Sequence, residues 1–132
     1  MSQLKKWIKT EEGFSDKVYT CTQGVPTIGY GFTSLSEDEA DVILDIKIQK
    51  LRFKVEAFLI AQKINLDSFR NDVLIDMAYQ LGFYGMAKFT KMLSALKDMD
   101  YDKAAEEMLD SVWCDQTPER CKLLASRMKN GY

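Results

Sequence analysis

The sequence predicts an α+β fold that is mainly α and that fits a single domain. Apolar residues recur at steps of three and four along most of the chain, which is the spacing of amphipathic helices. The stretch 14–35 breaks this pattern, because glycine, threonine, tyrosine and valine gather there around one proline. Such residues favour strands and tight turns. We therefore expect a small β-lobe at 14–35, set between helical parts, in one domain that spans residues 1–132.

The first helix is predicted to begin at the N-terminus and to end at Gly13. Leu4, Trp7 and Ile8 fall on one helical face. Ser2 is suited to cap the start of this helix, and a glycine is the usual residue just past a helix end. The helix therefore leads directly into the β-lobe.

A long helix is predicted over residues 37–62. Ser36 and Glu39 have the spacing of a capping box, in which each side chain bonds to the backbone N–H of the other residue. Apolar residues then recur at three- and four-residue steps for several turns. This helix is expected to connect the β-lobe to the rest of the chain.

A helical lobe of about four helices is predicted over residues 63–132, packing together with the N-terminal helix. Helices are expected over 67–81, 86–98 and 102–112, followed by a last helix that ends at Asn130-Gly131. Thr117 is suited to cap this last helix, and Pro118 suits its first position.

Charge and composition exclude several classes of function. The net charge is −2, so no overall attraction to nucleic acid is expected. The chain has no histidine, which argues against a His-based triad and against a zinc-activated water. The longest apolar runs have only a few residues, so no membrane insertion is expected. We expect no metal and no cofactor.

The cysteines and the N-terminus predict where the protein is made. Cys21, Cys114 and Cys121 are odd in number, and they are too few and too scattered for a disulfide scaffold. The first residues lack the apolar segment and the small-residue cleavage site of a secretory signal. Synthesis in a reducing cytoplasm is the simplest interpretation of both observations.

The stretch 12–31 carries the most informative motif. Glu12, Cys21 and Thr27 occur with eight and then five residues between them, around a glycine-rich turning segment. This arrangement can aim a carboxyl group, a thiol and a hydroxyl into one cleft. Hydrolysis of a glycosidic bond needs a proton donor and a group that deals with the oxocarbenium-like centre. The motif therefore suits glycoside hydrolysis.

Two glutamates compete for the role of proton donor. Glu12 follows Ile8 by one helical turn, so partial burial would raise its pKa and keep it protonated near neutrality. Glu11 follows Trp7 in the same way, and helical spacing alone leaves both residues open. Two solvated glutamates at a helix end are the simplest alternative.

The motif resembles the catalytic signature of the phage-type muramidases, glycoside hydrolase family 24. That family carries Glu, then Asp or Cys, then Thr at this spacing. The resemblance implies that Glu12, which stands directly before Gly13, is the general acid. It also implies a lysozyme-like fold over nearly all of the chain, with a β-lobe shortened between Phe32 and Ser36.

The role of Cys21 stays open at this point, because many members of the family have Asp there. A free thiol has a pKa near 8.5, so only a few per cent is thiolate at neutral pH unless the site lowers that pKa. Cys21 and Thr27 could hold an attacking water, which would invert the anomeric configuration. Alternatively, the thiolate could attack the sugar, which would retain it. The structural alternatives are a small buried Cys21 and a Thr27 that is only a good strand former.

The resemblance also implies a set of substrate contacts. Tyr30, Phe32 and Thr33 are expected to bind substrate from the β-lobe, while Tyr79 and Gln80 match cleft positions on the helical side. The glycines of this turn would let the backbone approach a sugar closely.

Arg120 and Gln116 are expected to support the site. Arg120 matches an arginine that pairs with the catalytic acid in relatives, which would lower the pKa of Glu12. Trp113 and Gln116 are expected mainly to pack and to form local hydrogen bonds. Met92 and Glu107 replace polar sugar contacts of the family, so the fine substrate contacts should differ here.

The resemblance predicts an endolysin-like muramidase. It would cut the β-1,4 bond between N-acetylmuramic acid and N-acetylglucosamine of bacterial peptidoglycan, with the polysaccharide between β-lobe and helical lobe. We expect a monomer that is made in the host cytoplasm and reaches the wall through a holin-type lesion, or on a phage tail. The alternatives are a lytic transglycosylase, which needs one Glu and no catalytic water, and a non-catalytic glycan-binding module.

Overall fold

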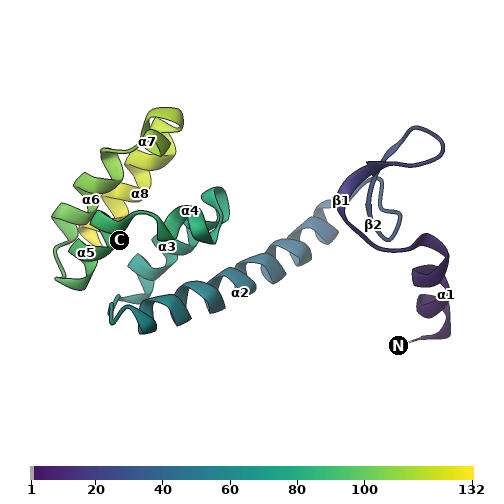
Figure 1. The fold of residues 1–132 in the computed structure, drawn as a ribbon, viewed down its shortest axis with the longest axis horizontal. Coiled ribbons are helices and arrows are strands. Elements are labelled where there is room, and N and C mark those ends of the chain that lie inside the picture. The colour runs from purple at the N-terminus through teal and green to yellow at the C-terminus, as the bar shows by residue number, and fades with distance from the viewer. Residues whose placement is uncertain (1) are drawn as a thin grey trace. The chain divides into compact units, whose positions relative to one another are not determined.

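The computed structural model describes residues 2–132, which form two compact units (Figure 1). The first unit ends at Leu44 and the second is Asp45–Tyr132. The boundary falls inside the long helix α2 (Glu37–Ala61), so this helix contributes to both units. Helices dominate and there is one two-stranded sheet, which confirms the α+β, mainly α, fold class. The single domain 1–132 stays a prediction.

The first unit begins with helix α1 (Gln3–Glu12), whose predicted caps are confirmed. The hydroxyl of Ser2 accepts a hydrogen bond from the backbone N–H of Lys5 at 3.1 Å. Gly13 follows the helix at φ 70°, and its N–H donates to the carbonyl of Lys9 at 3.0 Å. A positive φ costs glycine little, so the chain turns sharply there into the β-lobe.

The β-lobe is a short antiparallel hairpin of β1 (Ser15–Thr20) and β2 (Pro26–Gly29). Tyr19 lies opposite Thr27, and the ladder is irregular in the earlier part of β1. Both strands lie within the stretch 14–35, so the predicted small β-lobe is confirmed. Isolated two-stranded hairpins are marginal in water, so the contacts of α1 with the residues just after β2, Lys9 with Tyr30 and Glu12 with Gly31, matter for the geometry of this lobe.

Helix α2 begins with the predicted capping box. The N–H of Ser36 donates to the Glu39 carboxylate at 3.0 Å, and the N–H of Glu39 donates to the Ser36 hydroxyl at 3.2 Å. The helix ends one residue before the predicted boundary. The capping box and the apolar spacing of this helix thus predict its length well.

The second unit contains more helices than expected. They are α3 (Ser68–Leu81), α4 (Phe83–Ala87), α5 (Thr90–Lys97), α6 (Tyr101–Leu109), α7 (Val112–Gln116) and α8 (Pro118–Asn130). The boundaries of α3 and α8 agree with the predictions. The single helices predicted over 86–98 and 102–112 are wrong, because each of these segments contains a break.

Each break coincides with a specific side-chain contact. Phe89 has ψ 64°, outside the helical range, and its ring packs edge-on against Trp113 with centroids 5.9 Å apart. Ser111 ends the other segment, because its hydroxyl accepts the N–H of Cys114 at 3.1 Å and so caps α7. Apolar residues keep a helical spacing across both breaks, which hides them in the sequence.

The start of α8 is correctly predicted, but its cap is not. Thr117 precedes the helix and Pro118 takes its first position. The Thr117 hydroxyl makes no capping bond; it donates to the carbonyl of Trp113 at 3.1 Å and accepts from the Gln80 amide at 3.3 Å. The side chain therefore ties α7 to α3.

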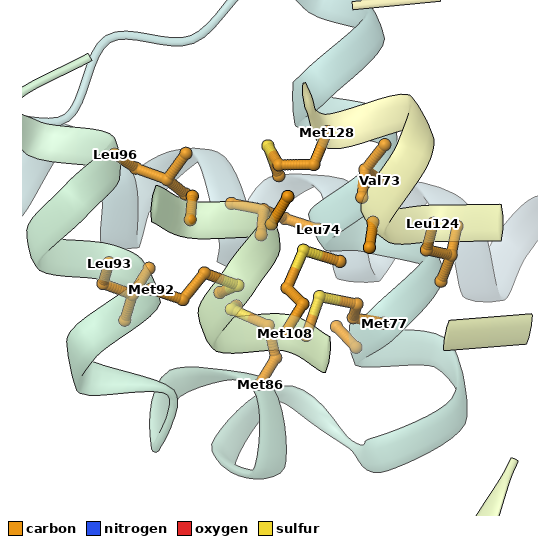
Figure 2. Packing of buried hydrophobic residues seen from close by; sticks show 14 of the residues in the cluster. Val73, Leu74, Met77, Met86, Met92, Leu93, Leu96, Met108, Leu124 and Met128 are labelled. Carbon is orange, nitrogen blue, oxygen red and sulfur yellow. The ribbon is translucent and has the colours of Figure 1, made fainter. Parts of the chain in front are cut away.

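The buried hydrophobic residues of residues 2–132 lie between Val55 and Met128, within the second unit. Figure 2 shows side chains from several helices meeting in this core, with many sulfur atoms among them. The fully buried methionines are Met77, Met86, Met92, Met108 and Met128. Methionine adapts to irregular gaps, which suits a core formed by short helices. No helix within residues 2–132 is both long and apolar enough to cross a lipid bilayer.

The cysteines do not all remain free, which corrects the sequence prediction. Cys114 of α7 and Cys121 of α8 form a disulfide, with Cα atoms 5.1 Å apart, and both residues are buried. The break at Thr117 folds α8 back against α7, so residues seven apart meet. Cys21 is free.

Candidate active site

The loop between the two strands carries Cys21, directly after the end of β1. The N–H of Cys21 donates to the carbonyl of Val25 at 3.0 Å, and the N–H of Gly24 donates to the carbonyl of Cys21 at 2.9 Å. Gly24 has φ 79°, a conformation that glycine adopts readily. These bonds fix the backbone that carries the thiol.

Cys21 of this loop and Thr27 of β2 both donate hydrogen bonds to the carbonyl of Val25. The backbone N–H groups of Val25 and Gln23 hold the pKa of the Cys21 thiol below its ordinary value. Partial burial opposes this effect, and the Thr27 hydroxyl adds to it. Thr27 is only 4% exposed, and its hydroxyl donates to the carbonyl of Val25 at 2.8 Å. Cys21 is partly exposed, so it is not the buried apolar cysteine of the structural alternative.

Glu12 ends α1, and its carboxyl group lies against the backbone of Gly31. A β-carbon at position 31 would stand 2.5 Å from Oε2 and 2.8 Å from Cδ of Glu12. Gly31 also has φ 78°. The absence of a side chain there thus leaves space for the carboxyl group, and the β-lobe holds the glutamate from one side.

The partial burial predicted for Glu12 is wrong, because the residue is exposed. Its neighbour at position 31 has no side chain with which to cover it, and Ile8, one turn earlier on α1, is exposed as well. The carboxyl group is therefore positioned by backbone contact and remains open to solvent.

A second tight turn presents the predicted sugar-binding residues of the β-lobe. Ile28 and Phe32 exchange two backbone hydrogen bonds, of 2.9 and 2.8 Å, which closes the turn. A β-carbon on Gly29 would come within 2.7 Å of the Phe32 ring. The glycines of this turn thus accommodate the protein's own Phe32 ring and Glu12 carboxyl group, whereas the sequence predicted room for a sugar.

Tyr30 and Phe32 border an apolar groove of about 300 Å³. Leu4 and Ile8 of α1 form much of its other wall. The Lys9 ammonium lies 5.1 Å from the centroid of the Tyr30 ring. Aromatic rings next to an open groove suit the apolar faces of sugar rings. Thr33 is exposed just beyond this turn.

The remaining predicted contacts lie in the second unit. Tyr79 is 48% exposed, so its ring is available to a ligand. Gln80 is partly buried, and its carbonyl oxygen accepts a hydrogen bond from the indole N–H of Trp113 at 2.9 Å. Its amide donates to Thr117 at 3.3 Å. Gln80 therefore bonds through both ends of its side chain to other parts of the protein, which confirms the predicted local role of Trp113.

Arg120 makes its ion pair with Asp76 of α3. The sequence assigned this arginine to Glu12, and that pairing stays a prediction. Sequence reasoning missed Asp76, although it stands four residues before Gln80 and therefore shares its helical face. Gln116 is exposed at the end of α7, and its supporting role also stays a prediction.

A comparison with protein families identifies the chain. The model of the family "Phage lysozyme" matches residues 9–130. The chain belongs to the phage lysozyme family. This match covers α1 from Lys9 onward and every later helix and strand.

Relatives of this phage lysozyme family member occur outside phages as well. "Probable T4-type lysozyme 1" and "Probable T4-type lysozyme 2" of Dictyostelium discoideum are 25% and 28% identical to it. Each alignment covers 99% of this chain and 96% of the relative. The "Pre-baseplate central spike protein Gp5" of Enterobacteria phage T4 is 26% identical over 89% of this chain, which corresponds to 26% of that protein.

The site of this family member also includes a residue that the sequence analysis did not name. Val25 bonds to both Cys21 and Thr27, and only the hairpin geometry reveals it. Across residues 2–132, no group of three or more His, Cys, Asp or Glu side chains is arranged to hold a metal ion. The arrangement offers acid–base and nucleophilic chemistry through a carboxyl group, a thiol and a hydroxyl.

Proposed function

We propose that the protein is a muramidase, which hydrolyses the β-1,4 bond between N-acetylmuramic acid and N-acetylglucosamine in bacterial peptidoglycan. The observation that supports this most strongly is the carboxyl group of Glu12, fitted against Gly31 in the unit in which Cys21 and Thr27 bond to the same backbone carbonyl. Membership of the phage lysozyme family supports a glycoside hydrolase.

Glu12 acts as the general acid in this proposal. In its protonated form it donates its proton to the glycosidic oxygen, so that the bond to the leaving sugar breaks without the release of an alkoxide. The backbone of Gly31 limits where the carboxyl group can lie. A fixed donor position matters, because proton transfer depends on hydrogen-bond distance to the substrate oxygen.

Cys21 acts on the other side of the sugar ring. The lowered pKa of its thiol increases the fraction of thiolate near neutral pH, compared with an ordinary cysteine. As a base, the thiolate takes a proton from a water that attacks the anomeric carbon, and the configuration inverts. As a nucleophile, it bonds to that carbon and water later releases the sugar, so that the configuration is retained. Thr27 supports either role because its hydroxyl helps to lower the pKa of Cys21.

Product analysis on purified peptidoglycan tests the proposal. A muramidase releases fragments that end in reducing N-acetylmuramic acid, which mass spectrometry after borohydride reduction detects. Fragments with 1,6-anhydro-muramic ends would identify a lytic transglycosylase instead. Binding to peptidoglycan without any fragments would identify a glycan-binding module. Assignment of the anomer that is formed first separates the two roles of Cys21.

Peptidoglycan is the proposed partner, and we propose that the protein acts on it as a monomer. The proposed route to the wall begins in the host cytoplasm and passes through a holin-type lesion. Expression in bacteria with and without a holin tests this route, since lysis should follow only when the lesion is made. The similarity to the spike protein Gp5 makes a tail-associated role the alternative.

A further inference from the structure

Helix α2, the long helix of Figure 1, has apolar residues on two opposite faces. One face carries Leu51, Val55 and Leu59, which pack in or against the core of the second unit. A helix at a protein surface normally buries one apolar stripe and has polar residues on its other side. The core of the second unit therefore does not account for the other apolar face of α2.

This other face carries an exposed stripe, formed by Ile46, Phe53 and Ile60. Their side chains are 48%, 77% and 78% exposed. They recur every seven residues, so they return to the same side of the helix at every second turn. Gln49 and Ala57, which are also exposed, lie between them on this side. Seven-residue spacing of apolar residues is typical of helices that pack side by side as a coiled coil.

The charges beside the exposed stripe are divided between two flanks. At 100° of rotation per residue, one flank is basic and the other begins with an acidic residue. The basic flank carries Lys47, Lys50 and Lys54. The other flank carries Asp45 and Glu56. The helix thus presents opposite charges on the two sides of one apolar stripe.

Two of these charges, on Asp45 and Lys50, are available to a partner. Both residues are exposed, and neither forms an ion pair within residues 2–132. They are five residues apart, whereas pairs within a helix form at three or four. Arg52, which shares the flank of Asp45, is by contrast paired with Asp72 at 2.9 Å.

We propose that the exposed stripe pairs with the same stripe of a second copy of this chain. The two α2 helices are parallel in this pair, and a twofold axis runs along them. Each residue of the stripe then meets its own counterpart, and Asp45 of one copy faces Lys50 of the other. The twofold axis forms this ion pair twice.

The charges of α2 disfavour two other arrangements. An antiparallel pair would bring the basic flank of one copy against the basic flank of the other, so that lysines repel each other. An anionic lipid surface attracts helices that are rich in Lys and Arg on the polar face. Helix α2 has six acidic and four basic residues, so it is not suited to such a surface.

The pair is weak, because the contact is small. Three apolar layers bury less than the roughly 1,200 Å² of total area that is typical of stable interfaces. We therefore expect a dissociation constant on the order of 10 μM or weaker. Such a pair separates on dilution, so it is compatible with a muramidase that acts as a monomer. It does not depend on the proposed function.

Analytical ultracentrifugation of the full chain tests the pairing, at concentrations from about 1 μM to about 1 mM. We expect the average mass to rise from one chain toward two across this range. Phe53→Asp should weaken the association at least about 100-fold, because it sets two carboxylates against each other at the contact. Tyr84→Asp is the matched control, since Tyr84 is 76% exposed but lies on α4, and it should associate like wild type. Because both side chains are exposed, both variants should keep the wild-type circular dichroism spectrum.

A charge exchange tests the parallel orientation. D45K and K50E each set like charges against each other, so each should weaken the association about tenfold. The double variant D45K/K50E restores opposite charges at both places and should associate within about twofold of wild type. Failure of the double variant to recover would overturn the parallel pair.

Three further results would overturn the proposal. The first is a wild-type chain that stays monomeric at every concentration, and the second is equal association of wild type and Phe53→Asp. The third is a chain that does not self-associate but binds phosphatidylglycerol vesicles, with binding lost in Phe53→Asp. That result would assign the exposed stripe to a membrane surface.

Discussion

At position 31, a single hydrogen atom in place of a side chain leaves room for the carboxyl group of Glu12. A methyl group there would stand 2.5 Å from Oε2, well inside normal contact. We therefore predict that Gly31→Ala displaces the carboxyl group. Since a displacement of about 1 Å can cost about 100-fold in rate, peptidoglycan turnover should fall by roughly that factor.

Gly82→Ala is the matched control for this prediction. Gly82 has φ 80° against 78° for Gly31, but nothing lies within 4 Å of its added β-carbon. Both variants should lose about 1 kcal/mol of stability from the left-handed backbone. Only Gly31→Ala should lose activity, so equal activities for the two would argue against the contact with Glu12.

The chemistry of Cys21 gives a prediction on pH. Because backbone N–H groups, those of Val25 first, stabilise the thiolate, its pKa lies below the ordinary value. Alkylation by iodoacetamide should therefore reach half its maximal rate below about pH 8.5. Thr27→Val removes the hydroxyl that helps to lower the pKa of the thiol, so the pKa should rise and alkylation at pH 7 should slow.

Mass spectrometry of the alkylated protein measures these rates at Cys21 separately from the disulfide cysteines. A half-maximal pH above about 8.5 in wild type would contradict the lowered pKa. If Thr27→Val leaves the rate of alkylation unchanged, the Thr27 hydroxyl has no effect on the pKa of the thiol. Complete alkylation without loss of lytic activity would show that Cys21 takes no part in the reaction.

Residue types and their spacing carried much of the prediction for the first unit. They pointed to Glu12, Cys21 and Thr27 together. In the structure the carbonyl of Val25 accepts hydrogen bonds from both Cys21 and Thr27, and the joint catalytic role of the three residues stays a prediction. The exposure of Glu12 could not be read from the helical pattern, because it depends on the backbone of a glycine that is 19 positions later in the chain. Long-range contacts of this kind leave no periodic signal.

At the scale of elements, the disulfide between α7 and α8 should stabilise the fold. It closes a loop between residues seven apart, for which loop-closure entropy predicts about 2.5 kcal/mol. Reduction should therefore lower Tm by roughly 10 °C, by the usual relation between stability and Tm. Calorimetry with and without a reducing agent measures this shift.

The variant Cys114→Ser/Cys121→Ser is the control, since a reducing agent should no longer change its Tm. A thiol assay on the unfolded, unreduced protein should find only Cys21 free. Three reactive thiols in that assay would contradict the pairing of Cys114 with Cys121.

Element boundaries were predictable where capping residues mark them. Ser2, Ser36 and Gly131 all lie where the sequence placed helix ends. The break at Phe89 was missed, because its cause is packing against Trp113, a residue 24 positions later. Thr117 was placed correctly but bonds to α3 and α7, since tertiary partners compete with the local cap.

At the scale of the whole molecule, the two units differ in what stabilises them. Buried hydrophobic residues lie in Asp45–Tyr132, whereas Thr27 is the buried residue described before position 45. Amides of α3, α6 and α8 should therefore exchange with deuterium at least about 100-fold more slowly than those of α1 and the hairpin. Hydrogen exchange with mass spectrometry measures this, and uniform protection would contradict it.

The fold class was predictable because it depends on composition and periodicity over many residues. Few other fold classes suit a mainly helical chain that is interrupted by one glycine- and threonine-rich stretch. The uneven distribution of buried residues was not predictable, because the apolar face of α1 has the same pattern as the faces that are buried. Periodicity identifies an apolar face, and packing decides what covers it.

The most direct test of the proposed muramidase compares Glu12→Gln with Glu11→Gln. Both replace an exposed glutamate at the end of α1, so both variants should fold like wild type. Loss of a general acid lowers the reaction rate by about 100- to 10,000-fold. We therefore expect Glu12→Gln to release reducing muramic acid ends more slowly by that factor. Glu11→Gln should release them at a rate near that of wild type. Equal release by Glu12→Gln and wild type would contradict the assignment of Glu12 as the proton donor.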